Sequence, residues 1–177
     1  MNHFVPPIGV IHLNSRTLSM IKKLLGGATF LFFASSAFAN DCAVTVESND
    51  AMQFNTSNVV IPASCDEFTV TLKHTGQLPK QSMGHNWVMT AKADGQAVAT
   101  DGMSAGLDNN YIKPNDERVI GATEIIGGGE ETSTTFSVKG LSKDEDYMFF
   151  CSFPGHIGIM QGTVTLESYS KNVLARQ

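Results

Sequence analysis

Three side chains that bind transition metals lie close together near the C-terminal end of the chain. Cys151, His156 and Met160 supply a thiol, an imidazole and a thioether, and Pro154 and Gly155 between them favour a turn. Two His nitrogens, one Cys sulfur and a weak axial Met sulfur form the ligand set of a blue-copper electron-transfer site. We therefore interpret this segment as a metal-binding loop that provides three of the four copper ligands.

The fourth ligand must come from another part of the chain, and His85 is the best candidate. A lone histidine is more often a packed structural residue than a ligand, so the assignment of His85 depends on the Cys151 loop. His156 is a stronger candidate because it lies between two other ligand types on a turn. His74 lies within a regular strand pattern, and we interpret it as a packed or pH-titrating histidine.

The neighbours of the proposed ligands suggest supporting roles. Gly84 leaves room for its own carbonyl oxygen to approach the metal from the side opposite Met160. We expect the Asn86 side chain to hydrogen-bond across to the loop that contains Cys151, and the Phe153 amide to point at the Cys151 sulfur. Such outer contacts orient metal ligands and tune the metal.

Other chemistries fit these residues less well. A structural zinc site would use more Cys or His at C-x-x-C spacing, and a catalytic one would need an open position and a general base. Nucleophilic catalysis by Cys151 with His156 would need a third orienting group and would leave Met160 unused. A two-copper oxidoreductase such as nitrite reductase would need more histidines than the mature chain has. A copper-storage or delivery protein would favour several Met or Cys ligands.

The N-terminal region indicates export. A charged start at residues 20–23 precedes a short apolar core at 24–33, and Ala37-Phe38-Ala39 fits a small-x-small cleavage site. The apolar core is shorter than the roughly 18 residues of a membrane-spanning helix. We expect residues 20–39 to be a signal peptide and 1–19 to be an upstream artefact of the assigned start. Residues 40–177 would be one periplasmic domain with a polar tail after about 167 and no membrane span.

Export changes how the charge and the cysteines are interpreted. The leader contains three basic and no acidic residues, so its removal changes the net charge from −5 to −8. An acidic protein of this size gives no electrostatic reason to bind nucleic acid, and its charge favours basic partners. In an oxidising compartment Cys42 and Cys65 should form a disulfide. Cys151 is then a free thiol that a metal would hold.

The mature sequence consists mainly of short apolar–polar alternations separated by turn residues. This pattern is typical of an all-β sandwich or barrel. The expected strands are 42–47, 59–61, 68–74, 87–91, 134–138, 147–151 and 162–166. The stretch 94–111 is rich in Ala and Gly and breaks the alternation, so it predicts one or two helical turns in a surface flap.

Taken together, these segments resemble the azurin family of bacterial cupredoxins over nearly the whole mature chain, from Cys42 to about Leu166. The resemblance is strongest at residues 52–56, 78–80, 83–88, 100–103 and 147–160. The Cys-x4-His-x3-Met spacing favours azurins over plastocyanin-like and amicyanin-like loops. The resemblance implies a Greek-key β-sandwich, cupredoxin-like, with one short helical flap.

The resemblance also implies a type 1 copper site and a role that is not enzymatic. His85, Cys151 and His156 would be the equatorial ligands, with Met160 and the Gly84 carbonyl as weak axial ones. Cys42–Cys65 matches the family disulfide, and His74 matches a family histidine that titrates away from the copper. The protein would be a monomeric electron carrier for redox proteins such as c-type cytochromes, nitrite reductase or amine dehydrogenase. These partners would contact an apolar patch around His156, made of Leu78, Met83, Met103, Phe153, Pro154 and Ile157.

Overall fold

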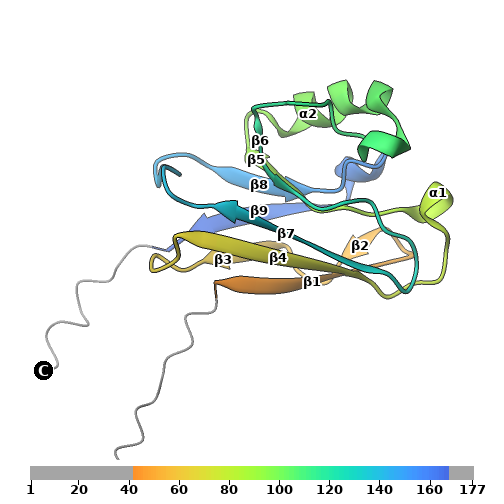
Figure 1. Ribbon diagram of the computed structural model, residues 1–177, viewed down its shortest axis with the longest axis horizontal. Coiled ribbons are helices and arrows are strands. Elements are labelled where there is room, and N and C mark those ends of the chain that lie inside the picture. The colour runs from red at the N-terminus through yellow and green to blue at the C-terminus, as the bar shows by residue number, and fades with distance from the viewer. Residues whose placement is uncertain (1–41, 168–177) are drawn as a thin grey trace, which may run out of the picture. The chain divides into compact units, whose positions relative to one another are not determined.

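The computed structural model describes residues 42–167. In this part of the chain two β-sheets pack face to face (Figure 1). The expected start artefact, signal peptide and C-terminal tail lie outside these residues. The strands are β1 (Ala43–Asn49), β2 (Gln53–Phe54), β3 (Asn58–Ile61), β4 (Glu67–His74), β5 (Val88–Ala91), β6 (Val119–Ala122), β7 (Glu131–Ser137), β8 (Tyr147–Phe150) and β9 (Gln161–Leu166). One sheet has the order β2-β1-β4-β7 and the other β3-β9-β8-β5-β6.

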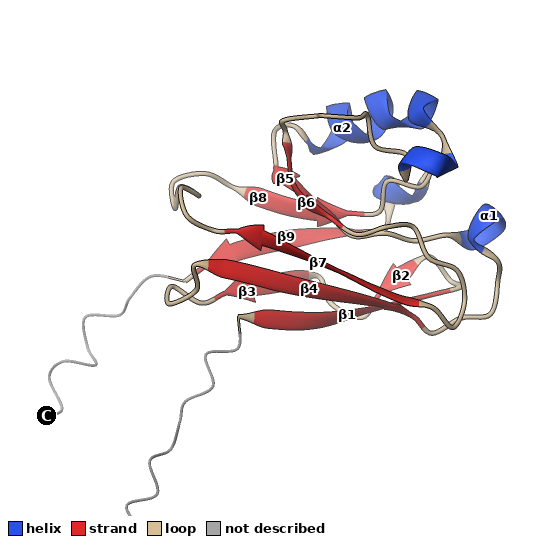
Figure 2. Cartoon of the chain, viewed as in Figure 1, coloured by secondary structure: helices blue, strands red, loops and turns tan. Residues whose placement is uncertain are grey.

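The strand pairing mixes hairpins with long-range crossovers. β1 pairs in parallel with β4, and β3 in parallel with β9. The remaining described pairs are antiparallel. This arrangement confirms the predicted Greek-key β-sandwich (Figure 2). The sequence pattern missed β2, which has only two residues, and β6, whose register with β5 is interrupted by an irregularity.

The main core lies between the two sheets and is centred on Trp87. Its indole ring stacks between Phe136, with ring centroids 5.9 Å apart, and Phe149, at 5.7 Å. The sequence alternation of β4 is reproduced in its burial, because Phe68, Val70, Leu72 and His74 all face inward. Burial of these large apolar side chains is the dominant favourable contribution to folding.

The four residues of β8 are all buried, which alternation alone does not predict. Tyr147 and Phe149 face the core between the sheets, whereas Met148 and Phe150 belong to a second apolar cluster beneath the helical flap. The strand therefore has two covered faces, and this explains its continuous apolar run.

The predicted flap contains helix α2 (Gly95–Gly102) and two short 3-10 turns, η1 (Met103–Ala105) and η2 (Leu107–Asn109). Its buried side includes Val98 and Ala99. A side chain at Gly95 would collide with the Met148 sulfur, so glycine lets the helix lie directly on β8. Within residues 42–167, no helix has the length and apolar character that crossing a membrane requires.

Candidate metal centre

The metal-binding loop is the connection between two paired strands. β8 and β9 are antiparallel neighbours, and the loop from Cys151 to Met160 joins them. The Cys151 amide donates to the Met160 carbonyl at 3.0 Å, so the two end residues of the loop pair with each other. This pairing brings the backbones of Cys151 and Met160 together at one end of the sandwich.

The interior of the loop is shaped by local hydrogen bonds. Gly155 has φ of 84°, a left-handed conformation that favours glycine. It is followed by the 3-10 turn η3 (His156–Gly158), and the His156 carbonyl accepts from the Met160 amide at 2.8 Å. The turn directs His156 back toward Cys151, so the imidazole Nδ1 lies 3.6 Å from Sγ.

His85 reaches the same point from the adjoining part of the sandwich. It follows the short helix α1 (Lys80–Met83) and forms an isolated antiparallel bridge with Ile126. Its Nε2 lies 2.9 Å from the Asn49 carbonyl, which requires Nε2 to carry the proton. Nδ1 is then left with a free lone pair, and it lies 3.8 Å from the Cys151 sulfur.

The three side chains form a compact and buried donor set. One nitrogen from each of His85 and His156 and the Cys151 sulfur lie within 4.8 Å of one another. His85 and Cys151 are fully buried, while His156 is 5% exposed and is the ligand nearest to the surface. A thiolate with two neutral imidazoles suits copper. The residues therefore fit the metal that the sequence pattern indicated.

Burial in the site favours neutral imidazoles and, when no metal is bound, a protonated Cys151 thiol. Burial lowers the pKa of His85 to about 4 and also lowers the pKa of His156. Burial raises the pKa of the Cys151 thiol to about 12, while hydrogen bonding to the backbone of Asn86 and Phe153 acts in the opposite direction. A metal cation must therefore displace the thiol proton on binding, whereas both histidines are ready to coordinate at neutral pH.

The two expected axial groups belong to residues next to the ligands, since Gly84 precedes His85 and the Met160 backbone pairs with that of Cys151. Met160 is fully buried at the end of the loop. The Gly84 carbonyl oxygen lies 3.9 Å from the Cys151 sulfur. A side chain at Gly84 would collide with the Lys80 carbonyl and with Ile125, so this close approach of the backbone requires glycine.

A buried hydrogen-bond network joins the two ligand segments. The Asn86 Oδ1 accepts from the Ser152 amide at 2.8 Å, and the Asn86 Nδ2 donates to the Ser152 hydroxyl at 2.8 Å. The hydroxyl is 2.7 Å from the carbonyl of Asn110 in the flap. The sequence suggested Asn86 but gave no signal for Ser152 or Asn110, because their partners are far away along the chain.

His74 is packed beside the site and is not part of the donor set. Its Nδ1 accepts from the Gly76 amide at 3.0 Å, and its Nε2 is 2.9 Å from the Met83 carbonyl. Both ring nitrogens are therefore used, which leaves no lone pair for a metal. The His74 ring stacks on the His85 ring with centroids 4.6 Å apart, and this contact helps to hold His85 in place.

The residues of the predicted apolar patch differ in how much of each is exposed. Leu78 is 42% exposed and Met103 is 48% exposed. Ile157 is half-buried and packs partly against the apolar cluster beneath α2. Ile159, two residues further on, is 61% exposed. The tip of the loop thus presents Ile159 to solvent, while Ile157 is half-buried.

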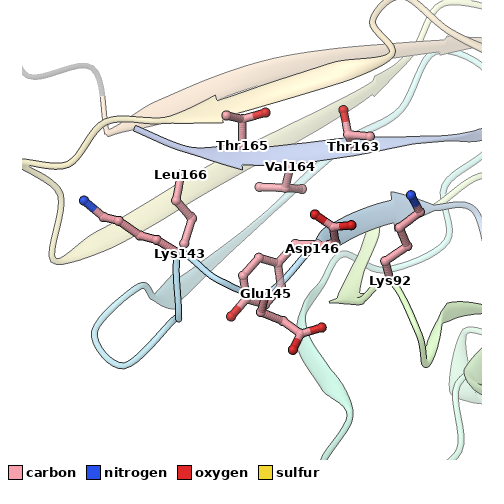
Figure 3. Close-up of a pocket in the computed structure, with 9 residues that line it drawn as sticks. Lys92, Lys143, Glu145, Asp146, Thr163, Val164, Thr165 and Leu166 are labelled. Carbon is pink, nitrogen blue, oxygen red and sulfur yellow. The ribbon is translucent and has the colours of Figure 1, made fainter. Parts of the chain in front are cut away.

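A separate pocket of about 280 Å³ lies at the other end of the strands, beside the start of β8 and the end of β9 (Figure 3). It is distant from the metal-binding loop along both strands. Its charged side chains are of both signs. The lining residues are Lys92, Lys143, Glu145, Asp146, Tyr147, Thr163, Val164, Thr165 and Leu166.

Comparison with known proteins agrees with this geometry. The family model of copper binding proteins of the plastocyanin/azurin family matches residues 40–167. An azurin from Alcaligenes faecalis is 60% identical over 127 residues, covering 72% of this chain and 99% of that protein. An azurin from Pseudomonas aeruginosa is 49% identical over 148 residues, covering 84% of this chain and 100% of that protein.

A solved structure of the azurin Az-iso2 from Methylomonas sp. strain J is also similar. Its TM-score is 0.70 and its identity 54%, covering 72% of this chain and 98% of that one. This chain therefore belongs to the plastocyanin/azurin family of copper binding proteins. Its cofactor is one type 1 copper ion, for which His85, Cys151 and His156 form the site. The predicted Cys42–Cys65 disulfide is also present.

Proposed function

We propose that this chain is a periplasmic electron carrier that passes one electron at a time between redox proteins. The convergence of two neutral imidazoles and one buried thiol is the observation that supports this best. Copper bound there would alternate between Cu(I) and Cu(II). We further propose that Met160 and the Gly84 carbonyl are its weak axial donors, and that Asn86 and Phe153 support the ligands from outside.

The protein residues would keep the site nearly unchanged between the two oxidation states. Asn49 holds the His85 ring through Nε2, and Asn86 holds the Cys151 segment through Ser152. The site is buried in a rigid sandwich, so solvent contributes little reorganisation. A site that changes little on oxidation or reduction supports fast electron transfer.

His156 is the proposed exit for the electron because it is the most exposed of the three site residues. Its ring lies 4.6 Å from the Phe153 ring, measured between centroids. The exposed apolar side chains of Leu78, Met103 and Ile159 would form a docking patch for a brief encounter. Small apolar patches suit transient redox contacts of low area.

The copper assignment is tested by loading the purified mature protein with Cu(II) and recording its visible spectrum. We expect an intense blue thiolate-to-copper band, and its absence would refute the function.

Two ligand variants test the residue assignments. Cys151→Ser should abolish the band because the thiolate is lost. Met160→Leu should keep a blue site and raise the reduction potential, since removal of a sulfur donor destabilises Cu(II) more than Cu(I). Cyclic voltammetry measures that shift.

The docking patch is tested by stopped-flow kinetics with c-type cytochromes from the same source. Met103→Lys should slow electron transfer because it places a charge within the apolar patch. Val60→Lys is the matched control, since Val60 is similarly exposed at 42% but lies on β3 near the opposite end of the sandwich. Equal rates for the two variants would argue against the patch.

Export is tested by N-terminal mass analysis of the protein in periplasmic extract. We expect the mature chain to begin at Asn40 or Asp41.

A further inference from the structure

Asn110 occupies an unusual position in the flap, because it contacts three segments that build the metal centre. It follows the 3-10 turn η2 and has φ of 55°, in the left-handed region. Tyr111 also has a positive φ, of 49°. Asparagine is one of the few residues other than glycine that adopts this conformation readily. The backbone thus reverses here, beside the copper ligands and not at a free surface.

The main-chain carbonyl of Asn110 completes the network between the two ligand segments. It accepts from the Ser152 hydroxyl at 2.7 Å and from the Asn86 Nδ2 at 3.2 Å. A hydroxyl has only one proton, so donation to this carbonyl leaves the Ser152 oxygen free to accept from Asn86. The hydroxyl also lies 3.1 Å from the Asn86 Oδ1, and the shorter contact makes the Asn110 carbonyl its preferred acceptor.

The side chain of Asn110 acts on a different segment. Its Oδ1 accepts from the Ile125 amide at 2.8 Å. Ile125 is 4% exposed and packs against Gly84, whose carbonyl faces the Cys151 sulfur. The next residue, Ile126, exchanges two hydrogen bonds with His85, at 3.0 and 2.9 Å. The Asn110 amide oxygen thus holds the segment that supports both Gly84 and His85.

We propose that Asn110 is a positioning residue for the metal centre. Its carbonyl orders the Asn86–Ser152 network, and its side-chain oxygen sets the placement of the Gly84 carbonyl and His85 through Ile125. The expected effects of Asn110 on the copper spectrum rest on the proposed copper function. Its expected effects on the metal-free protein do not. It assigns to the flap a role in ligand geometry in addition to covering the second apolar cluster.

Side-chain variants isolate the role of the Oδ1 acceptor, because every variant keeps the main-chain carbonyl. Asn110→Gly removes the acceptor and tolerates the positive φ, so it avoids backbone strain. Asn110→Asp keeps an oxygen in the same place and should rescue the function. Asn109→Ala is the matched control, because Asn109 is exposed and its side chain bonds only to Ala105 among the described residues.

Amide hydrogen exchange in the metal-free protein provides the first readout. For Asn110→Gly we expect exchange at the Ile125 amide to become about tenfold faster, as loss of one buried hydrogen bond implies. The His85 amide should exchange faster too, because its partner Ile126 is less well held. Asn110→Asp and Asn109→Ala should exchange as the wild type does. Unchanged exchange at both amides in Asn110→Gly would overturn the proposal.

Copper binding provides the second readout. We expect Asn110→Gly to bind copper about tenfold more weakly than the wild type, and its blue band to shift. The Asp variant should restore both properties. Faster exchange with unaltered affinity and spectrum would reduce Asn110 to a purely structural residue and refute the proposal. If the wild type itself shows no blue band, the proposed function fails, and the exchange data alone decide whether Asn110 orders the site.

Discussion

Gly84→Ala is the substitution whose consequence follows most directly from the structure. Gly84 has φ of −69° and ψ of 143°, which alanine adopts without strain. The cost must therefore come from packing. A Cβ at this position would lie 2.5 Å from the Ile125 Cγ2 and would also collide with the Lys80 carbonyl. Carbon atoms normally approach to about 3.5 Å, so a shift of about 1 Å is required.

The surroundings of Gly84 cannot absorb such a shift freely. Ile125 is 4% exposed, and its amide is fixed by Asn110. Overpacking of this kind costs about 2 kcal/mol of the free energy of unfolding. For a domain of this size, that corresponds to a fall of about 7 °C in the melting temperature. The same shift moves the Gly84 carbonyl relative to Cys151, so the blue band of the copper-loaded protein should shift as well.

Calorimetry of the metal-free protein measures the stability change without a contribution from copper. Gly158→Ala is the matched control, because a Cβ there meets no atom within 4 Å although the residue lies on the metal-binding loop. We expect that control to stay within about 0.5 kcal/mol of the wild type. The reasoning is refuted if Gly84→Ala melts within about 2 °C of the wild type and keeps its spectrum.

Two further predictions concern stability. Burial lowers the pKa of His85 to about 4 in the folded protein. As the pH falls, His85 therefore takes up a proton in the unfolded chain before it does so in the folded protein. Urea unfolding of the metal-free protein should therefore show full stability above pH 6.5 and a loss of about 3 kcal/mol by pH 4. A flat profile over that range would contradict it, and His85→Gln should flatten the slope. Replacing Cys42 and Cys65 together with alanine opens a loop with a separation of 23 residues. The free energy of unfolding should fall by about 3 kcal/mol, whereas a loss below about 1 kcal/mol would count against the chain-entropy estimate.

Local spacing accounts for the part of the site that could be predicted. Cys151, His156 and Met160 lie on one hairpin connection, so their proximity follows from the loop itself. The strand alternation likewise predicted the sandwich, because the inward residues of β4 repeat every second position. Short elements such as β2 and β6 were missed, since their pairing depends on neighbours distant in the sequence.

The exposure of the loop tip illustrates the limit of sequence reasoning. Ile157 and Ile159 are chemically identical and two residues apart, so composition cannot distinguish them. Ile157 is half-buried against the apolar cluster beneath α2, whereas Ile159, which follows the 3-10 turn, is 61% exposed. The predicted patch named Ile157, which is half-buried and lines a surface hollow with Met103 and Phe153, but it omitted the more exposed Ile159.

By itself, the sequence determined which atoms could bind a metal, because ligand chemistry belongs to the residue type and the loop spacing is local. It also determined the sandwich, through alternation of apolar residues along the chain. Only the tertiary structure decided which nitrogen of His85 is free, because that depends on the distant carbonyl of Asn49. It also brought Asn110 against Ser152 and Ile125. Such contacts join separate segments, and no local pattern in a single sequence specifies them.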